Sequence, residues 1–155
     1  MSNYQNRIDF ISRTRQILIQ YEHNCNYEKT LFMNCCVGLL IMPQQCADHD
    51  KNISVDGLVD YENWGIDTTK ITANEHRKGV DKNSIENIAY HIRNSICHYR
   101  LMNCNVENIE NIHIMDKSGD DVNAPITFDL ELSFDDFRKF VLKYADKLEE
   151  KLTNS

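Results

Sequence analysis

The sequence predicts a mainly α-helical protein, a bundle of about four principal helices with a β-hairpin inserted before the C-terminal helix. Two observations predict this architecture. Apolar residues recur at helical spacing in the N-terminal, central and C-terminal parts of the chain. Before the last of these parts, two short segments instead alternate apolar with polar residues. A chain of 155 residues has the size of one ordinary domain, so we expect a single domain over residues 1–155.

The first two helices are predicted over residues 4–22 and 28–42. Pro43 follows the second, and the residue before a proline disfavours helical geometry. Beyond it the periodicity fades, and residues 43–82 are predicted to form a long irregular connection with one short helix near 58–64. Loops of this length are uncommon without a function. The apolar positions of the two helices are Ile8, Ile11, Leu18 and Tyr21 in the first and Leu31, Phe32, Cys35, Leu39 and Met42 in the second.

The central helix is predicted to begin near Asn83, which with Glu86 resembles a capping box, and to continue to about Asn103. Successive residues of a helix are 100° apart, so the pattern predicts which side chains share a face. One apolar stripe is expected to face the core of the chain. It consists of Ile85, Ile88, Ala89, Ile92, Ile96 and Tyr99.

The hairpin and the last helix follow. NIHIM at 111–115 and PITFDLEL at 125–132 alternate apolar with polar residues, and KSGDD between them is typical of a turn. Ser133 with Asp136 provides a second capping signal. The helix that begins there is predicted to run to the C-terminus, with an apolar face of Phe134, Phe137, Val141, Tyr144 and Leu148.

The composition narrows the class of protein. The net charge of −7 argues against broad, salt-dependent coating of nucleic acid, because phosphate affinity comes from clustered Lys and Arg. Any RNA contact should therefore be local. Two stretches run against the overall sign, HIRNSICHYR at 91–100 and KITANEHRKGVDK at 70–82. The second is either a solvated loop or an auxiliary phosphate contact.

Neither a membrane span nor a metal site is expected. The longest apolar run, CCVGLLIM at 35–42, is much shorter than a bilayer-spanning helix. MSNYQNRID at the N-terminus has no signal-peptide pattern, so we expect a cytoplasmic protein. The cysteines show neither CxxC pairs nor zinc-site spacing and are interpreted as small buried residues. They are Cys25, Cys35, Cys36, Cys46, Cys97 and Cys104.

The central helix also carries polar residues that are unusual for a core. His91, Asn94 and His98 are predicted to form a polar ridge nearly opposite the apolar stripe, with Arg93 and Arg100 together on one flank. Between arginines and histidines runs a second, weaker apolar strip, composed of Tyr90, Cys97 and Leu101. The bland interpretation is a solvated polar face. The alternative is that the helix packs against a second partner along this strip.

A dimer would explain the strip. Arg93 and His98 point about 140° apart around the helix axis, which is five helical steps, so they cannot easily hold one small group within a single chain. If the strip of Tyr90, Cys97 and Leu101 packs against the same strip of a second chain about a two-fold axis, each Arg93 can approach the other chain's His98. The strip is therefore the predicted homodimer interface.

These residues resemble a known family. RNSICH is an R-N-x-x-x-H string near the end of a long helix, and it is similar to the R-x4-6-H motif of the HEPN (higher eukaryotes and prokaryotes nucleotide-binding) superfamily. With TLFMNCCVGLLIMPQQ upstream and the hairpin and helix downstream, the resemblance to small plasmid- and phage-defence-associated HEPN families covers about residues 28–150. By position, Arg93, Asn94 and His98 match the motif. Toxins paired with a nucleotidyltransferase antitoxin tend to show H-x-Y, whereas here Tyr99 follows His98 directly, so modification of this tyrosine by an antitoxin is not predicted.

The resemblance implies an HEPN-like helical bundle that acts as a homodimeric, metal-independent endoribonuclease without cofactor, in the role of a toxin or defence effector. The implied partners are an RNA substrate, a second copy of the chain and an antitoxin protein. Arg93, His98 and Asn94 are the implied catalytic residues. His91, Tyr99 and Arg100 are candidates for auxiliary roles.

The residue types suit this chemistry. RNA carries its own nucleophile, the 2′-OH, so the protein must supply a proton acceptor, a proton donor and a cation near phosphorus. Histidine can perform either proton transfer near neutral pH, and an arginine fork matches phosphate oxygens. Cleavage should leave a 2′,3′-cyclic phosphate.

Other functions remain open from the sequence. A metal-dependent nuclease is a weaker hypothesis, because clustered carboxylates are missing around the motif. Cys97 is an unfavourable nucleophile, because it points about 100° from His98. A non-catalytic HEPN-like module that binds RNA, a nucleotide or a protein is the main alternative. A plain interaction protein, whose Tyr90 strip docks a partner helix, is the third.

Overall fold

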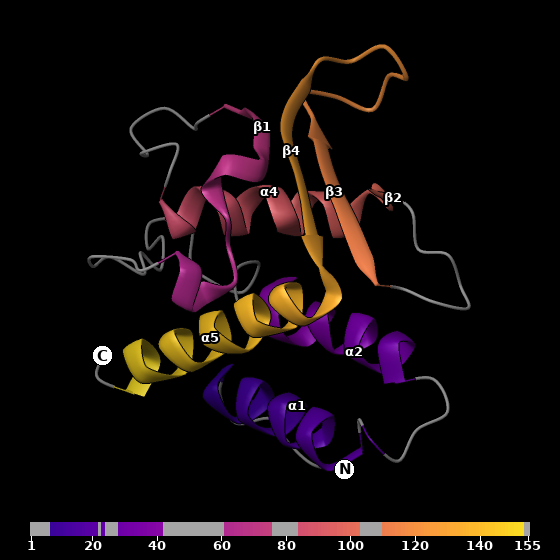
Figure 1. Ribbon diagram of the computed structural model, residues 1–155. Helices are drawn as coiled ribbons and strands as arrows, with labels where there is room; N and C mark the ends of the chain where they lie inside the picture. Colours follow the sequence, from indigo (N-terminus) through magenta and orange to yellow (C-terminus); the bar gives the residue numbers. More distant parts are fainter. Residues whose placement is uncertain are drawn as a thin grey trace. The chain divides into compact units, whose positions relative to one another are not determined.

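The computed structural model describes residues 7–21, 23, 28–41, 61–75, 84–102 and 110–153. These ranges contain four α-helices and a small antiparallel sheet, which agrees with the predicted mainly helical class (Figure 1). Contacts divide the chain into two compact units, one of residues 1–55 and 141–155 and the other of residues 56–140. None of the helices in these ranges is long and apolar enough to cross a bilayer.

The first unit consists of helices. It contains α1 (Arg7–Tyr21), α2 (Glu28–Cys36), the π-helix η2 (Val37–Ile41) that continues α2, and residues 141–153 of α5 (Phe134–Thr153). The two N-terminal helices are thus confirmed. Arg15 on α1 forms ion pairs with Asp146 and Glu149 on α5. The buried apolar residues of this unit include Ile11, Leu18, Phe32, Leu39, Leu40, Val141, Tyr144 and Leu148.

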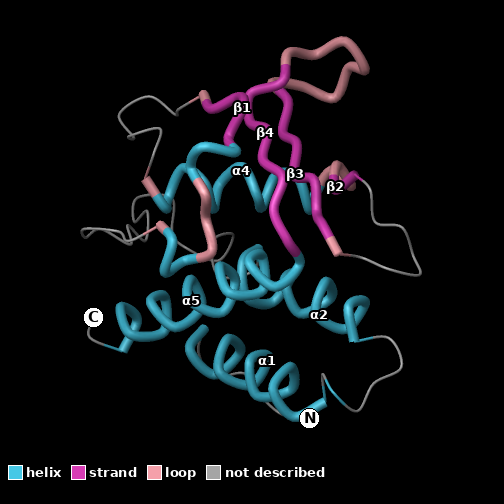
Figure 2. The backbone as a smooth tube through the Cα atoms, viewed as in Figure 1, coloured by secondary structure: helices cyan, strands magenta, loops and turns pink. Residues whose placement is uncertain are grey.

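The second unit is built on a four-stranded antiparallel sheet with strand order β1-β4-β3-β2 (Figure 2). The strands are β1 (Ile71–Asn74), β2 (Leu101–Met102), β3 (Asn111–Lys117) and β4 (Ile126–Ser133), and α4 (Ile85–Cys97) packs on β3. The predicted hairpin is confirmed as β3 and β4. Its register pairs Ile112 with Leu132 and Ile114 with Leu130, so these four apolar side chains are buried on one face.

The predicted irregular connection contains more structure than its sequence indicates. Its described part, from residue 61, holds the 3-10 helices η3 (Glu62–Trp64) and η4 (Thr68–Lys70) and then strand β1. The strand was not predicted, because four residues give too short an alternation and pairing with β4, such as Ile71 with Leu130, defines it. Residues 43–60 and 76–82, including most of the basic stretch, lie outside the described residues.

The central helix is shorter than predicted. Its N-cap is Ser84, one residue after the predicted Asn83, and the Ser84 side chain accepts a hydrogen bond from the Asn87 N–H at 3.1 Å. It ends at Cys97, not near Asn103, because Leu101 and Met102 pair with β3 as strand β2. Helical periodicity does not reveal that the helix ends at Cys97, since strand pairing involves residues that are distant in sequence.

The early helix end changes the predicted faces. Ile85, Ile88, Ala89 and Ile92 are buried, as the apolar stripe predicts. Tyr99, predicted at the end of the same stripe, is instead 96% exposed. Arg100 and Leu101 lie beyond the helix, so their predicted positions on its flank and in its weaker strip are wrong.

The start of α5 agrees with prediction, because the Ser133 hydroxyl oxygen accepts from the Asp136 N–H at 3.0 Å.

Gly65 gives a first testable prediction. Its φ is +75°, and a Cβ at this position would lie 2.4 Å from the backbone oxygen of Asp136. Gly65→Ala should therefore lower the free energy of unfolding by more than about 1 kcal/mol, measured by urea denaturation. Gly119→Ala is the control, since its nearest neighbour would be 3.8 Å away, and it should change stability by less than about 0.5 kcal/mol. Equal stability of the two variants would contradict this account.

Candidate functional site

The candidate site is organised around one buried carboxylate, Asp116 on β3. Only 3% of this residue is exposed. It accepts hydrogen bonds from His91 Nδ1 at 2.9 Å, Asn94 Nδ2 at 3.1 Å, Arg100 Nη1 at 3.2 Å and the Lys117 N–H at 2.9 Å. Burial raises the pKa of Asp116, but the hydrogen bonds from His91, Asn94 and Lys117 and the charge of His91 bring that pKa below its ordinary value. The group is therefore an ionised carboxylate at neutral pH.

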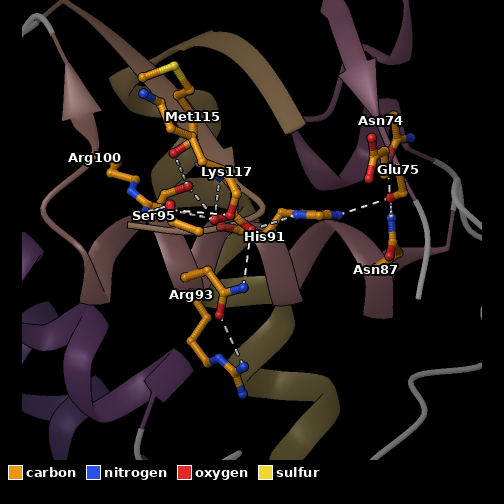
Figure 3. Close-up of polar contacts among 12 residues, drawn as sticks. Asn74, Glu75, Asn87, His91, Arg93, Ser95, Arg100, Met115 and Lys117 are labelled. Carbon is orange, nitrogen blue, oxygen red and sulfur yellow. Dashed lines mark hydrogen bonds and ion pairs between the residues drawn. The ribbon is translucent and has the colours of Figure 1, made fainter. Parts of the chain in front are cut away.

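His91 is the closest partner of Asp116. Its Nδ1 faces the carboxylate, and its Nε2 lies 3.0 Å from the backbone oxygen of Glu75 (Figure 3). Both partners are acceptors, so both ring nitrogens must carry a proton for both hydrogen bonds to form. The imidazolium form meets this requirement and makes a buried ion pair with Asp116. The ring also stacks on Phe128 with centroids 4.8 Å apart.

The predicted polar ridge is wrong for His91, because only 4% of this residue is exposed. The sheet covers this side of α4, through Asp116 and Phe128, and Glu75 after β1 closes it. Nearby, the Ser95 hydroxyl lies 2.8 Å from the backbone oxygens of both His91 and Met115, which ties α4 to β3 (Figure 3). This face of α4 is therefore a polar interior.

Arg100 links the end of α4 to the hairpin. Besides Asp116, its guanidinium donates to the backbone oxygens of Lys117 at 3.4 Å and Gly119 at 2.7 Å, and to Asp120 Oδ1 at 3.1 Å. Its side chain is only 13% exposed. Arg100 thus fixes the β3–β4 turn against the residues that follow α4.

The motif residues stand at the two ends of this network. Arg93 donates to Asn94 Oδ1 at 3.2 Å and lies over the ring of Tyr90, 5.1 Å from its centroid. In Figure 3, the Arg93 side chain leads away from the cluster around Ser95 and Lys117. At the other end, His98 Nδ1 lies 3.2 Å from Asp120 Oδ1. One chain of polar contacts therefore runs from the motif arginine to the motif histidine, in the order Arg93, Asn94, Asp116, Arg100, Asp120 and His98.

His98 has the environment that a proton acceptor needs. It is the C-cap of α4, and 47% of its side chain is exposed. The Asp120 carboxylate, 3.2 Å from Nδ1, favours the tautomer with the proton on Nδ1, in which Nε2 is the basic nitrogen. A substrate can therefore approach a nitrogen that is able to take a proton.

Asp116 and Asp120 were not identified from the sequence. The pattern KSGDD predicts only a turn, and it gives no role to Asp116 before it. A signal was present, because Asp116 follows Ile112 and Ile114 at two-residue intervals and so falls on the buried face of its strand. An acid at such a position requires partners, and the basic residues of the motif helix are the obvious source.

The predicted interface strip is only partly on the helix. Tyr90 is half-buried, Cys97 is exposed, and Leu101 belongs to β2. The prediction that the cysteines are buried is thus wrong for Cys97. It is confirmed for Cys35 and Cys36, and burial, with the neighbouring Cys35, raises the pKa of the Cys36 thiol. Cys25, Cys46 and Cys104 lie outside the described residues.

Metal ligation has no support in the described part of the chain, where no three His, Cys, Asp or Glu side chains gather as ligands would.

A comparison with curated proteins found no match, and neither did a comparison with solved structures. The family model HEPN pEK499 p136 matches residues 1–155, which is the whole chain. The chain therefore belongs to the HEPN pEK499 p136 family and to the HEPN superfamily.

Proposed function

We propose that the protein is a metal-independent endoribonuclease of the HEPN type, in which Arg93 and His98 act on one RNA linkage and Asn94 holds the arginine. Membership of a superfamily with nucleotide-binding and RNase-like domains supports this proposal. The observation that carries the proposal is the chain of contacts from Arg93 to His98. This chain includes a buried carboxylate and a second arginine, which link the two motif residues.

The reaction follows from these positions. His98 Nε2 accepts the proton of the 2′-OH, and the 2′-oxygen attacks phosphorus. Arg93 stabilises the negative charge that grows on the phosphate oxygens. The bond from phosphorus to the 5′-oxygen breaks, and the 5′-oxygen takes a proton from the imidazolium of His98. The products are a 2′,3′-cyclic phosphate and a 5′-hydroxyl end, with no net change in protons.

The proposed active form is a homodimer. Within one chain, four side chains separate Arg93 from His98 along the contact network, so the two motif residues occupy its opposite ends. A two-fold axis beside Tyr90 and Cys97 would bring Arg93 of one chain to the partner subunit's His98. The exposed thiol of Cys97 is available to such an interface.

Cleavage without metal is the direct test. Purified protein is incubated with total RNA in the presence of EDTA, and the ends of the fragments are analysed. We expect fragments with 2′,3′-cyclic phosphate and 5′-hydroxyl ends at rates that EDTA does not lower. Intact RNA under all conditions, or cleavage that stops with EDTA, would refute the proposed activity.

The alternative is a non-catalytic HEPN-like module that binds RNA, a nucleotide or a protein. One observation favours it, because Arg93 is engaged by Asn94 and Tyr90 within its own chain. RNA binding without any cleavage would select this alternative.

Under the main proposal, the biological role is that of a toxin or defence effector, with an antitoxin protein as a further partner.

A further inference from the structure

Tyr99 is the most exposed large hydrophobic residue among those described, at 96%, and it follows His98 directly. It is also the described non-glycine residue with positive φ, at 53°. An aromatic ring in water and a left-handed backbone are both unfavourable for a tyrosine. Strained backbone of this kind concentrates at functional sites, so the combination requires an explanation.

The backbone conformation belongs to a Schellman motif that ends α4. The Tyr99 N–H donates to the Ile96 oxygen at 3.2 Å, and the Arg100 N–H donates to the Ser95 oxygen at 2.8 Å. Glycine is the residue that normally occupies the position of Tyr99, because it adopts positive φ without strain. Local structure alone therefore favours glycine here, and the tyrosine lowers stability without making up for it by burial.

The backbone of Tyr99 is held in place beside the candidate site. On one side, Arg100 is fixed by Asp116, Gly119 and Asp120, and on the other side His98 is paired with Asp120. The backbone of Tyr99 thus lies between two anchored residues, and its side chain projects into solvent. Such a ring is an exposed flat surface on the residue that directly follows His98.

We propose that Tyr99 stacks on a base of single-stranded RNA and so places the adjacent linkage at His98. The inference rests on the proposed function and assigns it a substrate class, unpaired RNA. Stacking suits this chain, since a net charge of −7 limits phosphate attraction. The charge of Asp120 is offset by Arg100, so it does not repel the RNA backbone strongly. Every base has a π face, so the contact tolerates different sequences.

Affinity for two oligomers tests the stacking. A 2′-O-methyl RNA oligomer lacks the nucleophile and stays intact, and an abasic oligomer of equal length carries the same phosphates without bases. Tyr99→Asn keeps a residue that tolerates positive φ, and it should weaken binding of the first oligomer by roughly 5- to 150-fold. Binding of the abasic oligomer should change by less than about twofold. Tyr99→Phe should bind both as the wild type does.

Two further variants complete the design. Tyr99→Gly should raise the melting temperature by roughly 2 to 4 °C and still lose the base-dependent affinity, which a purely structural role cannot produce. Tyr21→Asn makes the same exchange at a tyrosine that is 50% exposed on α1, and it should leave both affinities unchanged. Equal effects of Tyr99→Asn on the two oligomers, or none, would overturn the proposal.

The outcomes separate this inference from the nuclease assignment. Base-dependent affinity at Tyr99 without any cleavage of ordinary RNA would support stacking and refute the endoribonuclease. Cleavage of ordinary RNA, with no base-dependent loss of affinity in Tyr99→Asn, would support the endoribonuclease and refute stacking. If Tyr99→Asn instead changes the sedimentation of the protein alone, with no difference between the oligomers, Tyr99 contacts a second copy of the chain and the stacking proposal is overturned.

Discussion

His98→Ala is expected to lower the rate of RNA cleavage by a factor of about 100 to 10,000, the usual contribution of a general base. The reason is local, because Asp120 lies beside Nδ1 of His98, which leaves Nε2 as the basic nitrogen, and no other group is proposed to take the proton of the 2′-OH. The measurement is the initial rate on a labelled RNA, with circular dichroism to verify folding. His113→Ala is the matched control, since His113 pairs with Asp129 on the sheet. A His98→Ala enzyme as fast as the control would remove His98 from the mechanism.

Mixed dimers extend this prediction to the composite site. Arg93→Ala should also be inactive, because lysine or alanine cannot replace the arginine fork. Mixing the Arg93→Ala and His98→Ala proteins should restore roughly a quarter of wild-type activity, because half the dimers then contain one intact site out of two. If mixing restores nothing while both proteins dimerise, Arg93 and His98 act within one chain.

Asp116→Ala is expected to lower the free energy of unfolding by roughly 3 to 5 kcal/mol, which is the usual effect of removing one member of a buried ion pair. The variant leaves His91, 4% exposed, and Arg100 without their shared carboxylate. Urea denaturation measures the effect. Asp129→Ala is the control, because Asp129 pairs with His113 at a position where its side chain is 22% exposed, and it should destabilise by about 1 kcal/mol or less.

The dependence on pH tests the same carboxylate. Because the pKa of Asp116 is lowered in the folded protein, its contribution to stability is complete above the unfolded pKa, about 3.9 for aspartate. The contribution is then lost as the pH falls through the lower pKa of the folded state. The stability difference between wild type and Asp116→Asn should therefore narrow as the solution is acidified below about pH 4. A difference that stays constant with pH would show that Asp116 does not bind protons differently in the two states.

Local periodicity predicts the elements whose signals come from near neighbours. The two N-terminal helices, the hairpin of β3 and β4, and the capping signal of Ser133 are all found as predicted. β1 and the end of α4 were not predicted, because both depend on pairing with β4 and β3. The register of a strand pair is set by residues far apart in sequence, which a helical or alternating pattern does not contain.

The candidate site divides in the same way. Arg93, Asn94 and His98 could be selected from one helix, since their types and spacing are visible in ten residues, and their catalytic roles are still predictions. Asp116 and Asp120 could not be connected to them. A helical wheel predicts His91 on a polar ridge because it contains no second element, and the sheet buries His91.

The sequence by itself therefore determined the mainly helical class, the hairpin and membership of the HEPN superfamily, which the match of the whole chain to a HEPN family model shows. Only the tertiary structure decided that His91 is an interior ion-pair partner, that Arg100 anchors the hairpin, and that Tyr99 projects beside His98. The physical reason is the range of the interactions. Periodicity and capping act over a few residues, whereas the partners that fix this site are 25 residues apart for His91 and Asp116 and 20 for Arg100 and Asp120.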